Sequence, residues 1–421
     1  MEKLALLGGK PTKTNSFPEW PQYDDHERKA LMDVLESRVW WRTPGTQTMK
    51  FEQEFATFQD ARYGIAVTNG TAALEIALAA IGVGPGDEVI IPDFTFVATA
   101  SAVLSVGALP VMVDVTPDTY CIDPDAIEAA ITSHTKAIIA VHLGGHPADM
   151  DRLLEVAVNN KLRLVEDSSH AHGSEWKGKK VGAIGDIGTF SFQSSKLITA
   201  GEGGIITTND QELERLARSI HDCGRMPGEW FYSHFIYGSN YRLSEWQGAV
   251  LRTQLARLPQ QADIRTRNAA WLDRELPKIS GISPQTQDSR CTSNGHYAYI
   301  FAYDKALFNG VPTERFIQAL NAEGIPTQAS YPPIHALDVF QSGKYRAKLT
   351  GHQKEEQHAF LQAVYPNTMR GAWETVWLPH SVLLGTEADM VKIIAAIRKI
   401  QENADELAAY KAGEKFVSAF R

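Results

Sequence analysis

Short apolar runs alternate with helix-like segments between about residues 64 and 210, and this alternation predicts the architecture. Seven runs have the length and composition of buried strands: 63–68, 87–92, 109–115, 135–142, 162–167, 187–192 and 203–208. Between them, apolar residues recur at helical spacing in 71–82, 95–107, 123–132 and 149–160. Strands and helices that alternate in this way form βαβ units. We therefore predict an α/β fold whose mostly parallel, seven-stranded sheet carries helices on both faces.

The pattern changes on either side of this region. Residues 24–38 predict an amphipathic helix with an acidic start, and two further helical stretches, 243–258 and 261–276, form a connector. Beyond about residue 290, strands are predicted at 296–303 and 325–331, and helices at 313–324 and 388–410. We expect four parts: an N-terminal segment (1–46), a large domain with the connector helices (47–277), a smaller C-terminal α+β domain (278–412) and a tail (413–421).

Composition narrows the class of protein. The 421 residues are 22% charged with a net charge of −9, and no basic stripe is present, so a nucleic-acid partner is not expected. No apolar run reaches the roughly 18 residues of a membrane span. The three cysteines, Cys121, Cys223 and Cys291, are far apart and form no CxxC motif, which favours a reducing compartment. We expect a cytoplasmic protein.

Lys196 stands in the segment TFSFQSSKLITAGEGGI (189–205), between a predicted strand and a cluster of glycines. Its neighbours are small and weakly polar, and Glu202 is the one nearby acidic residue. Most lysines in such a position are solvated surface residues. A lysine without a tight salt bridge can instead be neutral enough to attack a carbonyl group. The residues at the other strand ends decide between these two interpretations.

Asp167 ends the predicted strand LRLVED (162–167), at the edge of the sheet where α/β proteins bind ligands. A turn or helix-cap aspartate is the alternative. His170 and His172 follow it, and HLGGHP (142–147) adds two more histidines. Zinc needs further ligands at compatible spacing, and no such set is evident, so we predict no metal site.

Two other strand ends carry residues that suit a ligand. In VTNGTAALEIAL, a helix begins directly after a tight turn, and its N-terminus with Gly70 and the Thr71 hydroxyl suits an anion. The alternative is a plain turn and cap. The segment PDFTFVATA offers Phe94 and Phe96. Aromatics in such a place are usually core residues, but one at the mouth of the sheet would suit a flat ring.

Together these features match the needs of pyridoxal 5′-phosphate (PLP). Lys196 would hold the aldehyde as a Schiff base, and Asp167 would keep the pyridine nitrogen protonated so that the ring accepts electrons. The turn at Gly70 would bind the phosphate, and an aromatic face would stack on the ring. The sequence therefore predicts PLP as the cofactor.

The chain resembles the DegT/StrS family of PLP-dependent sugar aminotransferases, which have the aspartate aminotransferase fold (fold type I). The resemblance covers nearly the whole length, and its motifs are NGTAAL, PDFTFVATA, EDSSHAHG, SFQSSKLITAGEGG and GSNYRLSE. It implies two catalytic residues, with Lys196 as the Schiff-base lysine and Asp167 as the partner of the pyridine nitrogen.

The resemblance also implies further cofactor contacts. Phe96 falls at the position of the ring-stacking aromatic, and His170 lies where most of the family carries a glutamine near the ring oxygen. Asn240, in GSNYRLSE, matches an asparagine that reaches the phosphate of the neighbouring subunit, so the resemblance implies a homodimer with shared active sites. The positions that bind the phosphate fall on Gly70, Thr71 and Ser191.

Two branches of the family share features with this chain. WPQYDDHERKAL, VWWR and HAHGSEWKGKKVG look most like 3-amino-5-hydroxybenzoate synthases, while LALLGGKPT and DTYCIDPDAI also look like aminotransferases of scyllo-inosose and related cyclitols. The leading hypothesis is an aminotransferase that moves an amino group from glutamine or glutamate to a keto-sugar or keto-cyclitol, in aminosugar or antibiotic biosynthesis. One alternative is a PLP dehydratase of the aminohydroxybenzoate type. Another, of a different class, is a non-catalytic regulator with a PLP fold.

The N-terminal segment is rich in tryptophan, with Trp20, Trp40 and Trp41 all placed before the first predicted strand. Indole faces stack on the C–H groups of sugar rings, and arginine donates to hydroxyls or a carboxylate. Trp41 and Arg42 are therefore candidate substrate contacts, on a segment expected to cover the site. The alternative is that the tryptophans form a hydrophobic latch between subunits.

Overall fold

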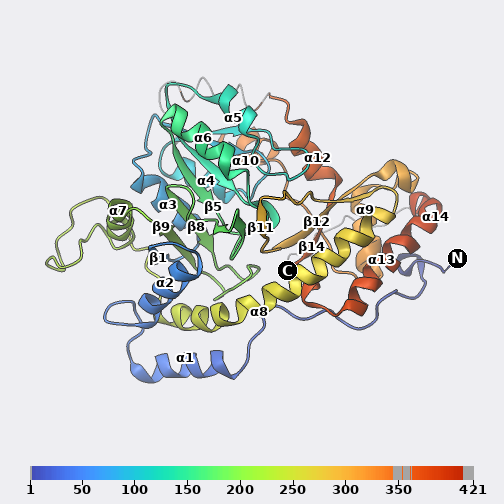
Figure 1. Ribbon diagram of the computed structural model, residues 1–421, viewed down its shortest axis with the longest axis horizontal. Coiled ribbons are helices and arrows are strands. Elements are labelled where there is room, and N and C mark those ends of the chain that lie inside the picture. The colour runs from blue at the N-terminus through green and yellow to red at the C-terminus, as the bar shows by residue number, and fades with distance from the viewer. Residues whose placement is uncertain (1, 345–352, 354–360, 362, 411–421) are drawn as a thin grey trace.

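A computed structural model describes residues 2–344, 353, 361 and 363–410, and it contains the predicted sheet (Figure 1). All seven predicted strands pair in the order β1-β9-β8-β5-β4-β2-β3. Their bounds are β1 Tyr63–Val67, β2 Glu88–Pro92, β3 Leu109–Val113, β4 Thr135–Val141, β5 Arg163–Asp167, β8 Ile187–Ser191 and β9 Gly204–Thr208. Only β9 runs antiparallel to its neighbours, so the sheet is mostly parallel, as predicted.

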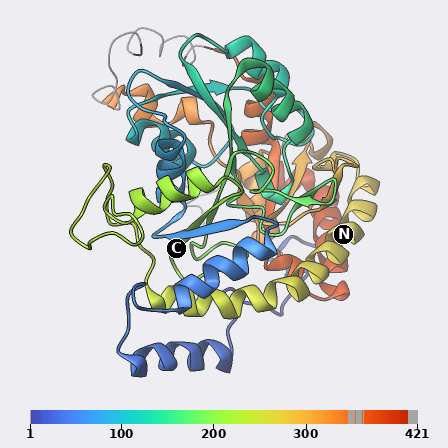
Figure 2. The same cartoon turned by 60° about the vertical axis from the view of Figure 1, so that its left-hand side comes forward.

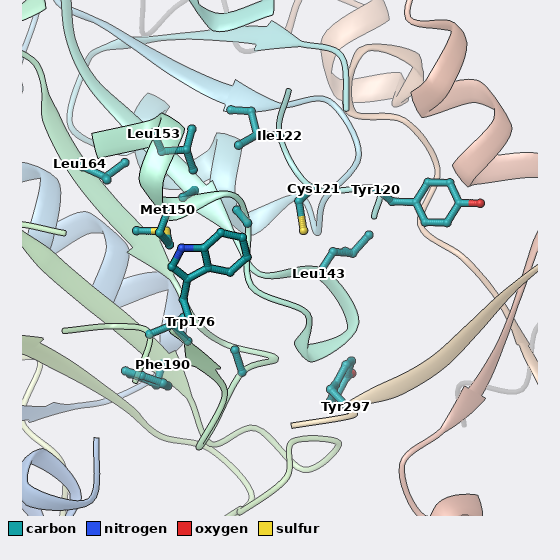
Figure 3. Packing of buried hydrophobic residues seen from close by; sticks show 14 of the residues in the cluster. Tyr120, Cys121, Ile122, Leu143, Met150, Leu153, Leu164, Trp176, Phe190 and Tyr297 are labelled. Atoms are coloured by element: carbon teal, nitrogen blue, oxygen red, sulfur yellow. The ribbon is translucent and has the colours of Figure 1, made fainter. Parts of the chain in front are cut away.

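Helices cover both faces of this sheet, which explains why its strands are apolar nearly throughout. One face packs against α3 (Gly70–Ala80), α4 (Ala98–Ser105) and α7 (Gln211–His221). The other packs against α2 (Gln47–Phe58), α5 (Pro124–Ala130), α6 (Met150–Asn160) and part of α8 (Glu245–Glu275). Figure 3 shows Trp176 among the buried side chains of this second face, close to Met150. The predicted α/β architecture with two helical layers is therefore confirmed.

A second, four-stranded sheet carries its own apolar core. Its order is β10 (Ile282–Pro284), β12 (Ala298–Tyr303), β14 (Thr375–Pro379) and β13 (Gln328–Ala329). The core includes side chains from α9 (Thr313–Ala322), α13 (Glu387–Glu402) and the last turns of α8. Leu4 and Phe17 belong to it too, so the start of the chain packs on this sheet.

Shorter elements complete the described chain. A three-stranded sheet has the order β11 (Cys291–Ser293), β6 (Glu175–Trp176) and β7 (Lys179–Lys180). The remaining α-helices are α1 (Asp25–Ser37), α10 (Asp338–Gln341), α12 (Pro366–Glu374) and α14 (Ala404–Ala409). The 3-10 turns are η1 (Ala5–Leu7), η2 (Leu143–Gly145), η3 (Leu276–Lys278), η4 (Lys305–Phe308), η5 (Ile334–Ala336) and η7 (Val382–Leu384). The expected tail at 413–421 lies outside the described residues.

Two helix predictions were wrong in their boundaries. The expected pair 243–258 and 261–276 is the single helix α8, which continues through Pro259. An interior proline removes a helical hydrogen bond, and buried side chains lie on both sides of it here, at Leu258 and Gln261. Conversely, the expected helix 388–410 divides at Asn403, whose side chain donates to the carbonyls of Lys399 and Glu2.

Helix α8 links the two sheets, while α1 lies apart from them. In Figure 1, α8 runs from beneath the large sheet toward α13. Figures 1 and 2 both show α1 on the outer side of α8, away from the sheets. Arg257 of α8 pairs with Glu27 and Asp24 at the start of α1. In the part of the chain that the structure describes, no helix is long and apolar enough to cross a membrane.

Candidate active site

The carboxyl ends of β1, β5 and β8 meet at one edge of the large sheet, where several predicted cofactor residues lie. β5 ends at Asp167 and β8 ends at Ser191, while Gly70 begins α3 directly after the turn that follows β1. Val67 of β1 and Ser191 of β8 both pair with Gly204 of β9. The topology of the sheet thus brings together residues that are far apart in the sequence.

Asp167 is buried, with 7% of its surface exposed, and neutral groups hold it. The Thr99 hydroxyl donates to Oδ2 at 3.1 Å, and the Ser169 N–H donates to Oδ1 at 3.2 Å. Within the described residues, no lysine, arginine or histidine forms an ion pair with this carboxylate. Its charge therefore remains for a bound cationic group, such as the protonated nitrogen of a pyridine ring.

The first turn of α3 forms a cradle that only a glycine permits. A Cβ placed on Gly70 would lie 2.7 Å from the Cβ of Ser191, which is a steric clash. Asn69 caps the helix by accepting from the Ala72 N–H at 2.9 Å. The remaining N–H groups of a first turn have no partner inside the helix, and with the Thr71 and Ser191 hydroxyls beside them they suit a phosphate. This cradle and Asp167 fit the two charged ends of PLP.

Lys196 lies on the loop that follows β8, and its side chain is buried, with 9% of the residue exposed. Its Nζ sits 4.6 Å from the centroid of the Tyr297 ring. No carboxylate pairs with it in the part of the chain that the structure describes. Burial without a counter-charge distinguishes Lys196 from a solvated surface lysine, which was the alternative interpretation of the sequence.

The loop that carries Lys196 is fixed by hydrogen bonds to every carbonyl from residue 191 to residue 195. Three of the donors are ring N–H groups from distant parts of the chain. They are His172 to Ser191 O, Trp20 to Ser194 O and His380 to Ser195 O, each at 3.0 Å. The Thr199 hydroxyl donates to Phe192 O, and the Lys196 N–H donates to Gln193 O. We refer to residues 191–196 as the lysine loop.

His170 is fully packed and faces Lys196. Its ring stacks on Tyr297 with 3.9 Å between centroids. The Gly144 N–H donates to its Nδ1 at 3.4 Å, so the ring proton sits on Nε2, which lies 3.2 Å from the Tyr331 hydroxyl. Burial, followed by the charge of Lys196, holds the pKa of His170 well below its ordinary value. The imidazole is therefore neutral and donates through Nε2.

Tyr297 and Tyr331 are site residues that the sequence did not reveal. Tyr297 lies directly before β12, and its hydroxyl is 3.1 Å from the Ser195 hydroxyl. Tyr331 follows β13, and burial raises its pKa well above the ordinary value. Neither tyrosine belongs to a motif, because each comes from the small-sheet region and reaches the large sheet only through folding.

Phe94 and Phe96 have different environments: one is a core residue and the other lies at the surface. Phe94 is fully buried, against Trp377 and Tyr120. Phe96 is 53% exposed, and its ring lies 5.7 Å from that of Tyr331. An exposed aromatic side chain beside Tyr331 is available to a flat ligand.

Asn240 is exposed and lies on the backbone segment that runs along the end of β1. Its neighbour Tyr241 accepts a hydrogen bond from the Thr68 N–H, and Asn240 itself forms a bridge with Asp222. The side-chain oxygen of Asn240 accepts weakly from the Arg242 N–H at 3.4 Å. The amide is therefore free to contact a molecule outside the chain.

Arg42, a predicted substrate contact, pairs with an acidic side chain of the chain itself. Its guanidinium forms a two-bond pair with Glu52, at 2.7 and 3.1 Å, and Arg218 joins the same carboxylate. Burial raises the pKa of Glu52, but the charges of Arg218 and Arg42 outweigh this, and the pKa is lowered. Arg42 therefore belongs to a buried ion-pair network.

Trp41 is 44% exposed and lies outside the lysine loop as well. It meets Phe231 edge to face at 6.5 Å and Arg242 at 5.9 Å. It is Trp20 that reaches the lysine loop, through Ser194 and an edge contact with His380 at 4.4 Å. The N-terminal segment thus reaches the lysine loop through Trp20.

Two hollows on the surface, of about 580 and 700 Å³, lie along α1 and α8. None of the predicted site residues lines either of them. Both open to solvent; besides the helix pair, Gln47 and Glu54 of α2 line the larger one, and residues 199–201 line the smaller one. We therefore place the candidate site by its converging chemical groups at the sheet edge rather than by the size of a hollow.

Comparisons with known proteins identify the family of this chain. Residues 21–398 match the DegT/DnrJ/EryC1/StrS aminotransferase family. The chain is 42% identical to a 3-amino-5-hydroxybenzoate synthase of Amycolatopsis mediterranei (strain S699) over 383 residues, which is 90% of this chain and 95% of that protein. It is 39% identical to an L-glutamine:2-deoxy-scyllo-inosose aminotransferase of Streptomyces fradiae over 420 residues. That match covers 96% of this chain and 99% of that protein.

Solved structures give the same picture. The crystal structure of a 3-amino-5-hydroxybenzoic acid synthase superposes with a TM-score of 0.84 at 40% identity, covering 94% of this chain and all of that one. The crystal structure of DesI in the presence of its TDP-sugar product superposes with a TM-score of 0.81 at 30% identity. The match covers 96% of this chain and 98% of that one. The chain belongs to the DegT/DnrJ/EryC1/StrS aminotransferase family and has the fold type I architecture of that family.

Proposed function

We propose that the protein uses PLP to transfer an amino group from glutamine to a cyclic ketone that carries several hydroxyls. The observation that carries the proposal is the buried Lys196, which has no counter-charge among the residues that the structure describes and lies on the same sheet edge as Asp167 and the cradle at Gly70. When bound, PLP supplies an electron sink for the carbon that loses or gains the amino group.

The residues of the chain take separate parts in this reaction. Lys196 Nζ would bind the aldehyde carbon of the cofactor and move the proton at the donor Cα. Asp167 would hold a proton on the pyridine nitrogen, and the first turn of α3 with Thr71 and Ser191 would hold the phosphate. Phe96 would cover one face of the ring. His170, neutral and donating through Nε2, would lie near the ring oxygen.

The substrates follow from the relatives. Several are named L-glutamine:2-deoxy-scyllo-inosose aminotransferases and match along nearly their full length at 37–39% identity. Glutamine rather than glutamate is therefore the proposed donor, and a keto-cyclitol is the proposed acceptor, in aminocyclitol or antibiotic biosynthesis.

A second candidate is the dehydration carried out by aminohydroxybenzoate synthases. It is favoured by the relative at 42% identity and by the histidine at 170, which resembles that branch. A non-catalytic regulator is disfavoured, because Lys196, Asp167 and Ser191 are all present and lie near the same edge of the large sheet.

We further propose a cytoplasmic homodimer with sites shared between subunits. The three cysteines are unpaired, as expected in a reducing compartment. Asn240 is exposed, and the loop before it carries several exposed aromatic side chains, which suits a subunit interface. We also retain the division into the segment 1–46, the large domain 47–277 and the small domain 278–412.

The test is a substrate panel with the purified protein and PLP. The donor half-reaction is followed by the absorbance of the cofactor on addition of glutamine or glutamate. Amination of free keto-cyclitols by the glutamine-treated enzyme, detected by mass, would support the proposal. Loss of water with a new aromatic absorbance would favour the second candidate, and activity on nucleotide-linked keto-sugars alone would overturn the proposed acceptor.

A further inference from the structure

Arg265 of α8 is a buried cation that forms no ion pair within the described part of the chain. It is fully buried, and its Nε donates to Gly295 O at 3.1 Å. Neither Nη1 nor Nη2 has a protein partner among the described residues. Burial lowers the pKa of Arg265 to about 9, so the group remains charged at neutral pH. Leaving buried donors unpaired is costly, so the arrangement calls for a physical explanation.

Two buried histidines carry unpaired acceptors of the matching kind. His172 and His380 each donate Nε2–H to the lysine loop, at Ser191 O and Ser195 O. In that tautomer Nδ1 is a lone-pair acceptor, and neither Nδ1 has a protein partner within the described chain. Burial, with the charges of Arg265 and Lys196, lowers the pKa of both rings to about 3, so both are neutral.

The backbone places Arg265 between these two histidines. Its acceptor residue Gly295 lies against His172 and against Leu197, which directly follows the lysine loop: a Cβ there would sit 3.3 Å from His172 O and 3.1 Å from Leu197 Cδ1. One turn further along α8, Asn268 donates at 2.8 Å to the carbonyls of Leu383 and Gly385. That segment begins at His380, whose carbonyl accepts from the Leu383 N–H. The face of α8 that carries Arg265 is thus packed between the two histidine segments.

The chemistry of these atoms selects the ligand. Arg265 offers two donors, while the histidines offer two lone pairs. An anion would be attracted to the guanidinium but repelled by the imidazole lone pairs. Water both donates and accepts, and buried water typically makes about three such bonds. We propose that Arg265 is a positioning residue for the lysine loop, acting through buried water that it shares with Nδ1 of His172 and of His380.

This role would fix the tautomers of both rings. A proton moved to Nδ1 would turn the lone pair of Nε2 toward Ser191 O or Ser195 O, and the hydrogen bond at that end of the loop would be lost. The lysine loop would then hold Lys196 less firmly. The inference rests on the proposed role of Lys196, but its structural half, the state of the two imidazoles, can be measured without any reaction.

The test uses Arg265→Met, which removes charge and donors at similar length, and Arg265→Lys, which keeps the charge. Arg267→Met, an exposed position on the same helix, is the matched control. The ring nitrogens of ¹⁵N-histidine-labelled, PLP-free protein are followed by NMR against pH. The charged and titratable groups around the two rings are Arg265, Lys196, His170 and Tyr297, and each of the two rings is also near the other.

In the wild type and in Arg267→Met, both rings should stay neutral with the proton on Nε2 between pH 5 and pH 8. In Arg265→Met, the protonation midpoints of His172 and His380 should rise by about one pH unit, because a nearby positive charge is removed. The Nδ1–H tautomer should also appear. Arg265→Lys should keep the low midpoints. In the loaded enzyme, Arg265→Met should lower kcat and leave KM for the ketone little changed.

Unchanged ring shifts in Arg265→Met would overturn the proposal. If that variant does not fold, a high-resolution crystal structure of the wild type decides. Water at about 3 Å from an Arg265 Nη atom and a histidine Nδ1 would support the proposal, whereas a dry gap or a chloride ion would refute it. The expected NMR result, together with a reactive lysine other than Lys196, would refute the proposed function while leaving the Arg265–histidine coupling intact.

Discussion

The lysine loop and the loop at 225–240 follow neighbouring parts of the large sheet, yet they are built in opposite ways. The carbonyls of residues 191–195 are all bonded, and three of the donors come from remote segments. The other loop, yellow-green and beside α7 in Figure 1, projects from the body. In it, 71% of Trp230 and 96% of Tyr237 are exposed.

The difference suggests that one chain alone fixes the lysine loop, whereas the loop at 225–240 needs a second molecule to cover it. A backbone whose carbonyls are all bonded holds its side chains in fixed geometry, which suits a group that must meet a reacting atom. A cluster of exposed aromatics on a projecting loop is typical of a surface that another protein covers. The predictions below test the division, beginning with the largest expected effect.

Replacing Asp167 should damage catalysis most while leaving the fold intact. In Asp167→Asn the neutral amide cannot keep the pyridine nitrogen protonated, so turnover should fall about a thousandfold or more, with PLP still bound. Rates come from the half-reaction with glutamine, and cofactor content comes from absorbance. Asp263→Asn, on an exposed part of α8, is the control. Turnover near the wild-type rate would reduce Asp167 to a structural cap.

Mixed dimers should reveal whether Asn240 acts across the subunit boundary. Lys196→Ala and Asn240→Ala chains, each impaired alone, are refolded together or exchanged at equal amounts. A heterodimer would hold one intact site, so the mixture should recover about a quarter of wild-type activity.

The matched mixture of Lys196→Ala with Asp167→Asn should recover none, because both residues belong to the same chain's site. Activity in neither mixture would argue against shared sites. Recovery in both mixtures would mean that residues other than Asn240 also act across the subunit boundary.

Removing Arg42 should cost stability rather than substrate binding. Arg42→Met leaves Glu52 buried with one cation fewer, at a cost of about 3 kcal/mol in the free energy of unfolding. Denaturant unfolding measures the loss, and the exposed Arg398→Met serves as the control. KM for the ketone should be unchanged. A raised KM at wild-type stability would restore the substrate role that the ion pair argues against.

The ion pairs of Glu52 also predict how the free energy of unfolding changes with pH. The pKa of Glu52 is below its ordinary value of 4.5, so its contribution to stability is fully present above that pH and is lost as pH falls through the lowered value. Unfolding free energy should therefore decrease on acidification below about pH 4.5, and Arg42→Met should flatten this decrease. An equal slope in variant and wild type would exclude Arg42 from the network.

Replacing Trp41 should have the smallest effect on the reaction. Its ring meets Phe231 of the projecting loop and not the lysine loop, so Trp41→Ala should weaken the dimer in sedimentation experiments. KM for the ketone should change by less than about tenfold. A larger rise in KM with the dimer intact would revive Trp41 as a substrate contact.

The sequence predicted the large sheet and its edge well because local pattern and topology agree there. The seven strands are apolar on both faces, and parallel strands bring their carboxyl ends together, which placed Asp167, Ser191 and Gly70 correctly at one edge. The short strands β10 and β14 were missed. β10 has only three residues, and β14 pairs with β12, from which helices α9 and α12 separate it in the sequence.

Contacts between remote segments account for the remaining differences. Nothing near Trp20 or His380 in the sequence indicates that their ring N–H groups bind the lysine loop. Arg42 looked available because the pattern does not show that Glu52 faces it across the turn into α2. Tyr331 and Arg265 likewise gain their roles only from the small-sheet region and α8.

The most direct test of the account asks which lysine binds PLP. The structure describes three buried lysines, and two of them are neutralised: Lys13 pairs with Asp389, and Lys399 pairs with Glu323. The protein loaded with PLP is reduced with borohydride, digested and mapped by mass spectrometry. The account predicts the pyridoxyl group on the peptide that contains Lys196, and its loss in Lys196→Arg. Modification of another lysine, with the Lys196 peptide unlabelled, would contradict it.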